Sequence, residues 1–257
     1  MISNQNIPKS IRETLKKLIS PTFFSLSVLL ALTFKTSLAE AVPARIDNYN
    51  GDGTSFSAEV FLGDPTNICF ATVKHGIGPE IVQKLNQQGI SVQTLAAGSN
   101  KTRDGVTTFC VAFASKINTL QEFYLALEAI KQLTNLDVTP LVQPDSSNWQ
   151  PPSFADLFND GERVDVSKLS AIYPDGSLVS GNNLFTANPG RSGGSLYYDG
   201  NLIGLINGSA SKNDPQYGNL NFLYFTSIEH SQTSRTDAIV RTSQGNIYAR
   251  DLIFDAR

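Results

Sequence analysis

A serine set among glycines is the residue of this 257-residue chain best suited to covalent chemistry. Ser192 lies in the loop Gly190-Arg191-Ser192-Gly193-Gly194. Glycine at position 190 permits a sharp turn, which would aim the backbone N–H groups of Gly190 and Ser192 at one point and form an oxyanion hole. Glycine and serine are also the ordinary residues of tight turns. These five residues alone therefore leave a nucleophile and a plain turn equally open.

The residues after the loop predict a β-hairpin. Asp199-Gly200 separates two apolar runs, 196–198 and 202–206, and Asp-Gly is a strong signal for a two-residue hairpin turn. The order of loop, strand, turn and Gly-apolar-apolar resembles the second-barrel core of trypsin-like (chymotrypsin-fold) serine peptidases, mainly over 184–227. Ser195 stands where that family usually has proline. The residues in register are Pro189, Gly190, Ser192, Gly193, Gly194, Gly200, Gly204, Leu205 and Ile206.

The resemblance implies acyl transfer with Ser192 as nucleophile and a histidine as its base. Histidine suits this role because its pKa lies near neutrality. His75 follows the apolar strand predicted over 67–73, in a context that loosely resembles the family's histidine motif. His230, the other histidine, comes after the last matched strand. We therefore favour His75 as the base, although a loop histidine leading into a helix is the other interpretation.

A carboxylate that orients the imidazole would complete such a site. Asp137 resembles the family's aspartate because it precedes an apolar strand between His75 and Ser192. Asp104 and Asp165 are alternatives, and a solvated surface aspartate remains open for each. The mechanism requires no cofactor and no metal.

A calcium-loop spacing also occurs near the start of the mature chain. Asn48, Asn50, Asp52 and Glu59 take positions one, three, five and twelve of an EF-hand-like loop, with Gly53 at position six. No helix is predicted on either side, so we favour a plain turn.

The first 41 residues have the pattern of an export signal. Lys9, Arg12, Lys16 and Lys17 precede a twelve-residue apolar run at 23–34, shorter than the roughly 20 residues needed to span a bilayer. Ala39 and Ala41 supply the small residues of a cleavage site. We predict cleavage after Ala41, export to the periplasm or outside the cell, and no stable membrane insertion afterwards; an uncleaved anchor is the alternative.

Export would place Cys69 and Cys110 in an oxidising compartment. We expect the two to form a disulfide, with two buried free thiols as the alternative.

The remaining chain divides into an N-terminal domain, 42–145, and a C-terminal domain, 146–257, at a proline-rich stretch. Pro79 begins one predicted helix, and Thr119-x-x-Glu122 forms a capping box for another. The order strand, helix, strand, strand, helix, strand is ferredoxin-like. We therefore predict a mostly β protein with an α+β N-terminal half: either trypsin-like β-barrels with helical insertions, or a ferredoxin-like domain joined to a half-barrel.

The charge balance excludes partners bound by electrostatics alone. With 20 basic and 23 acidic residues, the chain has no basic footprint for nucleic acid.

The sequence predicts an exported serine endopeptidase acting on protein or peptide substrates. The alternative is a non-catalytic module, or a degenerate peptidase, that binds a peptide or protein partner.

Overall fold

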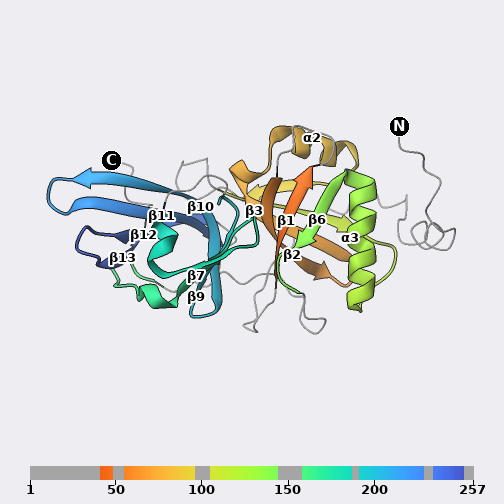
Figure 1. Ribbon diagram of the computed structural model, residues 1–257. Coiled ribbons are helices and arrows are strands. Elements are labelled where there is room, and N and C mark those ends of the chain that lie inside the picture. Colours follow the sequence, from red (N-terminus) through yellow and green to blue (C-terminus); the bar gives the residue numbers. More distant parts are fainter. Residues whose placement is uncertain are drawn as a thin grey trace.

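Two antiparallel sheets make up most of the protein (Figure 1). The computed structural model describes residues 41–48, 55–95, 105–143, 158–186, 191–228 and 234–251. The predicted signal segment, apart from Ala41, and most of the proline-rich linker lie outside these residues. Among the described residues, no helix combines the length and apolarity needed to cross a bilayer.

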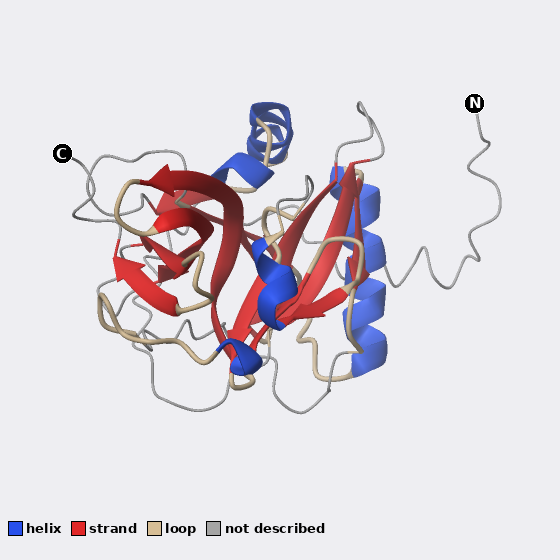
Figure 2. Ribbon diagram, turned by 60° about the vertical axis from the view of Figure 1, so that its left-hand side comes forward, coloured by secondary structure: helices blue, strands red, loops and turns tan. Residues whose placement is uncertain are grey.

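The first sheet has the strand order β4-β5-β3-β2-β1-β6. Two α-helices cover one of its faces, and the second sheet packs against the other (Figure 2). The strands are β1 (Val42–Asn48), β2 (Ser55–Asp64), β3 (Asn67–Val73), β4 (Val92–Leu95), β5 (Val106–Ala112) and β6 (Leu136–Pro140). The helices are η1 (Lys74–Gly76), α2 (Pro79–Gln87) and α3 (Leu120–Thr134).

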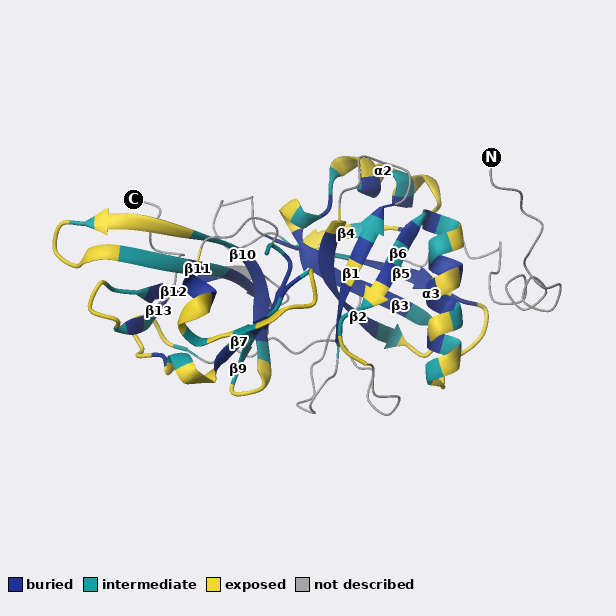
Figure 3. Cartoon of the chain, viewed as in Figure 1, coloured by how far each residue is buried: buried dark blue, intermediate teal, exposed yellow. Residues whose placement is uncertain are grey.

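Alternation along the strands assigns side chains to these two faces. Phe56, Ala58 and Val60 of β2 join the core beneath the helices, as do Ile68 and Phe70 of β3. The residues between them point the other way, toward the second sheet. Both β2 and β3 are therefore buried on both faces (Figure 3).

The two predicted helix starts are confirmed. Pro79 occupies the first turn of α2. Glu122 N–H donates to Thr119 Oγ1 over 3.2 Å, and Glu122 Oε2 accepts from Thr119 N–H over 3.0 Å, which completes the capping box of α3. Asn135 ends α3 in the left-handed region, with φ 58°.

The second sheet has the order β13-β12-β11-β10-β9-β7-β8. Its strands are β7 (Leu169–Ile172), β8 (Leu178–Ser180), β9 (Ser195–Tyr198), β10 (Asn201–Asp214), β11 (Gly218–Ile228), β12 (Ser234–Arg241) and β13 (Ile247–Asp251). Short helices η2 (Val166–Lys168) and η3 (Gly181–Phe185) lie among them. The predicted Asp-Gly hairpin is confirmed, since Asp199 and Gly200 both have positive φ and Tyr198 pairs with Asn201.

Neither sheet closes into a barrel through the strand pairings of the described residues, which corrects the barrel prediction. The first sheet buries a face under α2 and α3, so it has no need to curl on itself. In the second, residues 161–164 run beside β13 and lead through η2 to β7 near the other end. The sheet curls around its core, but no strand pairing of the described residues joins β13 to β8.

The ferredoxin-like alternative describes only part of the first sheet. β5 lies between β3 and β4, the split β-α-β arrangement that the element order predicts. The β1–β2 hairpin then separates β3 from β6. The sheet therefore has six strands, because the β1–β2 hairpin is inserted between two strands of the ferredoxin-like set.

The expected disulfide is present. Cys69 of β3 and Cys110 of β5 lie directly opposite each other and are bonded. A Cβ on Gly63 would lie 2.6 Å from the Cys69 sulfur, so only glycine lets β2 pass over the bridge.

Replacing both cysteines by serine should lower the free energy of unfolding by roughly 2 to 4 kcal/mol, because the bridge closes a long loop in the unfolded chain. The two residues are 41 positions apart. Guanidinium unfolding of the double variant and of the wild type with and without reductant measures the effect. A midpoint that does not move on reduction would contradict the prediction.

Candidate active site

The backbone of the turn that carries Ser192 is hydrogen-bonded to β10. Gly193 N–H donates to the Ile206 carbonyl over 2.7 Å, and Ile206 N–H donates to the Gly194 carbonyl over 2.8 Å. Ser192 is partly buried, and its hydroxyl donates to the Asn207 carbonyl over 3.0 Å. A hydroxyl has one proton to donate, so in this structure Ser192 directs it at β10 rather than at an imidazole.

Gly193 allows the same turn to lie against the first sheet. Its φ of 83° is in the left-handed region. A Cβ there would lie 2.7 Å from the Ser57 carbonyl oxygen of β2, well inside van der Waals contact. Glycine at this position therefore sets both the shape of the turn and its closeness to β2.

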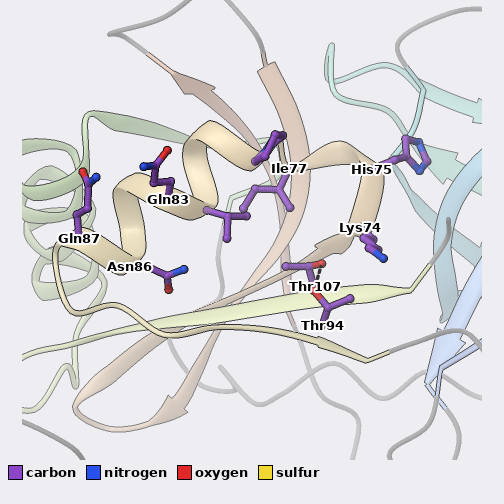
Figure 4. Close-up of a pocket in the computed structure, with 11 residues that line it drawn as sticks. Lys74, His75, Ile77, Gln83, Asn86, Gln87, Thr94 and Thr107 are labelled. Carbon is purple, nitrogen blue, oxygen red and sulfur yellow. Dashed lines mark hydrogen bonds between the residues drawn. The ribbon is translucent and has the colours of Figure 1, made fainter. Parts of the chain in front are cut away.

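His75 lies on η1, directly after β3. Val73, two residues earlier, is fully buried and packs against Leu205 of β10. Because Asn207 is two residues beyond Leu205, the segments bearing His75 and Ser192 both lie against the same portion of β10. Figure 4 shows the exposed His75 ring projecting from η1 away from α2.

Asp137 is not brought to this place. It lies on β6 at one edge of the first sheet, with β1 and β2 between β6 and β3. Strands are about 4.8 Å apart, so β6 is roughly 14 Å from β3. The Asp137 carboxylate instead accepts from Lys131 Nζ over 2.9 Å.

Two of the other candidate catalytic residues lie outside the described part of the chain, as do His230 and residues 50, 52 and 53 of the calcium-loop spacing. Asp104 is one of them, and its neighbour Gly105 accepts a 2.7 Å hydrogen bond from Lys74 N–H, beside His75. Gly190 of the predicted oxyanion hole is the second. Asp165 is described and caps η2, accepting from Ser167 N–H over 3.0 Å.

A groove of about 960 Å³ opens between η1–α2 and the β4–β5 pair (Figure 4). Lys74 and His75 lie at one end, and the Thr94 and Thr107 hydroxyls, 3.0 Å apart, form part of its floor. Its size is within the range of small-ligand sites. Among the described residues, no group of three or more His, Cys, Asp or Glu could hold a metal ion.

Glu59 is the polar residue of the junction whose role the sequence did not reveal. It is fully buried on β2 and accepts a hydrogen bond from the Ser195 hydroxyl at the start of β9. Burial raises the pKa of its carboxyl to about 8, although the bond from Ser195 lowers that pKa in part. Burial also raises the pKa of Tyr197, and the nearby Glu59 charge raises it further.

The alternation of apolar residues in β2 could have indicated which face Glu59 occupies. Phe56, Ala58 and Val60 share the face under the helices, so Glu59 takes the opposite one. An acidic residue there is typical of a sheet with one solvated face. No sequence signal indicated that a second sheet covers it.

Comparison with protein-family models, with curated proteins and with solved structures finds no match to this chain.

Gly193→Ala should destabilise the protein by roughly 2 to 4 kcal/mol, because it combines left-handed backbone strain with overlap against Ser57. Gly200→Ala is the matched control: Gly200 has φ 78° but open space around its Cβ position. This variant should cost only about 1 kcal/mol. Equal losses of unfolding free energy in the two variants would show that the contact with β2 contributes nothing.

Proposed function

We propose that the chain is an exported serine peptidase that cleaves peptide bonds by acyl transfer. The observation that carries the proposal is the packing of Val73 against Leu205, which brings the segments of His75 and Ser192 to one portion of β10. A nucleophile and base must come within hydrogen-bond reach, about 2.6 to 3.2 Å, and this distance is often longer without substrate. To donate to a base, the hydroxyl of Ser192 would have to rotate away from the Asn207 carbonyl.

In the proposed reaction Ser192 Oγ attacks the scissile carbonyl carbon while His75 takes the hydroxyl proton. Backbone N–H groups of Gly190 and Ser192 would stabilise the resulting oxyanion. His75 then gives the proton to the leaving amine as the C–N bond breaks. A water molecule, deprotonated by His75, then attacks the acyl carbon. The ester bond to Ser192 Oγ breaks, and His75 returns the proton to Ser192.

The edge of β10 supports an extended peptide as the substrate. β9 pairs with β10 only as far as Leu205, and the Ser192 turn pairs with Ile206. Beyond Ile206, the strand pairings of the described residues engage β10 only with β11. A peptide added as a strand along this edge would pass beside Ser192 and gain main-chain hydrogen bonds.

For the orienting carboxylate, the backbone contacts favour Asp104 over Asp137. Gly105, joined to Asp104 by a peptide bond, accepts from the residue preceding His75. Asp137 is three strands away in the sheet and paired with Lys131.

A non-catalytic peptide-binding module is the second candidate. It is favoured by the hydrogen bond from Ser192 to Asn207, which fixes the hydroxyl as a structural donor. The same β10 edge would then bind a peptide without cleaving it.

A fluorophosphonate probe, which reacts with activated serines, tests the proposed peptidase. Wild type should be labelled at Ser192, Ser192→Ala should not be labelled, and His75→Gln should be labelled about 10² to 10⁴ times more slowly. Glu128→Gln, on the exposed face of α3, is the control and should react like wild type. Mass spectrometry of the labelled peptide gives the site and the rate.

Equal labelling of wild type and His75→Gln would remove His75 from the mechanism. No labelling of a folded wild type, combined with peptide binding that survives Ser192→Ala, would favour the binding module.

The orienting carboxylate has its own test. Asp104→Asn should slow labelling by one or more orders of magnitude, because the imidazole would lose its orientation and the stabilisation of its charge. Asp137→Asn should leave the rate unchanged. The reverse ranking of the two labelling rates would restore Asp137.

A further inference from the structure

Glu59 lies in the contact between the two sheets. Its strand neighbours are Pro43 of β1 and Ala71 of β3. Across the junction, Ser195 of β9 donates to its Oε1. Among the described residues, Glu59 Oε2 and the neighbouring Ser57 Oγ are buried without hydrogen-bond partners. Burying a carboxyl group with one oxygen unbonded costs folding free energy, so the presence of Glu59 here requires a physical explanation.

The groups that face Glu59 offer no compensation for a negative charge. Pro43, Ala71 and Ser195 are uncharged. Tyr197 on β9 is neutral as well, because burial raises its pKa, so it supplies no positive charge. On β1, Arg45 is bonded to Asp47 over 2.9 Å and is largely exposed. A carboxylate in this dry junction would be an unpaired buried charge, which proteins tolerate poorly.

We propose that Glu59 is a positioning residue for Ser192: its neutral carboxyl holds the start of β9, and with it the 191–194 turn, against β2. The part of this proposal that concerns the reactivity of Ser192 rests on the proposed peptidase function. Two contacts connect the positions. Ser195 directly follows the turn, and Gly193 of the turn lies against the Ser57 carbonyl two residues before Glu59. The same Ser57 carbonyl accepts a 2.5 Å hydrogen bond from Thr72 Oγ1, which fixes β2 to β3.

The direction of the pH effect follows from the protonation states. Burial raises the pKa of Glu59 from 4.5 to about 8, so the folded protein holds a proton that the unfolded chain has lost. The contribution of Glu59 to stability is therefore fully present below pH 4.5 and declines up to about pH 8. As pH rises through about 8, Glu59 becomes charged, and separating β9 from β2 relieves the cost by admitting water.

Hydrogen–deuterium exchange on the full chain tests the proposal without reference to catalysis. At pH 9, amides of residues 191–198 should exchange about tenfold faster in wild type than in Glu59→Gln, since charged Glu59 would outnumber neutral Glu59 by about ten to one. At pH 7 the two proteins should agree within about twofold. Glu128→Gln, with an exposed acid, should match wild type at both pH values. Equal exchange of wild type and Glu59→Gln at pH 9 would overturn the proposal.

Two further measurements protect the test against a variant that fails to fold. In wild type alone, the onset of faster exchange in 191–198 should have its midpoint near pH 8. Ser195→Ala should move that midpoint upward, because the lost hydrogen bond is the one that lowers the pKa of Glu59. A midpoint that is absent in wild type, or unmoved in Ser195→Ala, would refute the role of Glu59.

The labelling rate of Ser192 separates positioning from general stabilisation. In wild type it should fall about tenfold between pH 8 and pH 9.3, whereas in Glu59→Gln it should stay level. A wild-type rate that stays level above pH 8 would contradict positioning. Absence of labelling in every variant at every pH would instead defeat the peptidase proposal, while the exchange data would still decide whether Glu59 holds the turn.

Discussion

The contact of β2 and β3 with β9 and β10 is the constraint on which the candidate site depends. Each sheet has its own apolar core, one under the helices and one inside the curl of the second sheet. The contact between the sheets is thin by comparison, with Val73 against Leu205 as its apolar centre. Polar groups occupy much of the rest. The position of η1 relative to the Ser192 turn is therefore set by a few close contacts rather than by a large buried area.

These contacts are of unequal kinds. Gly193 against the Ser57 carbonyl is a steric limit: it fixes how near the turn may come to β2 and does not depend on pH. The hydrogen bond from Ser195 to Glu59 is an attraction across the junction. Burial keeps the accepting carboxyl neutral, because a charge there would have to be kept from water. The first sets the distance between the sheets and the second maintains it. A leucine at position 59 could fill the space, but it would leave the Ser195 hydroxyl buried without an acceptor.

Local signals predicted most of the elements and little of their assembly. The capping box at Thr119, the proline of α2 and the Asp199-Gly200 turn each act within a few residues, and all three formed as expected. The opposed cysteines also paired. The strand order was harder to predict from the sequence, because the insertion of β1 and β2 between β3 and β6 depends on contacts between residues distant in sequence. The barrel expected from the resemblance failed for the same reason, since closure depends on how both sheet edges are used.

The site shows the same division between local and long-range information. The bonds of the Ser192 turn to Ile206 join residues within one hairpin, so the glycine pattern could predict this turn. Asp137 was chosen for its local context before a strand, but strand order placed it at the far edge of the sheet. Glu59 was noticed only as position twelve of a calcium-loop spacing. Its burial was not predicted, because its environment is made by β9, 136 residues further along the chain. A carboxyl that is ordinary in sequence becomes chemically unusual only when a distant strand removes it from water.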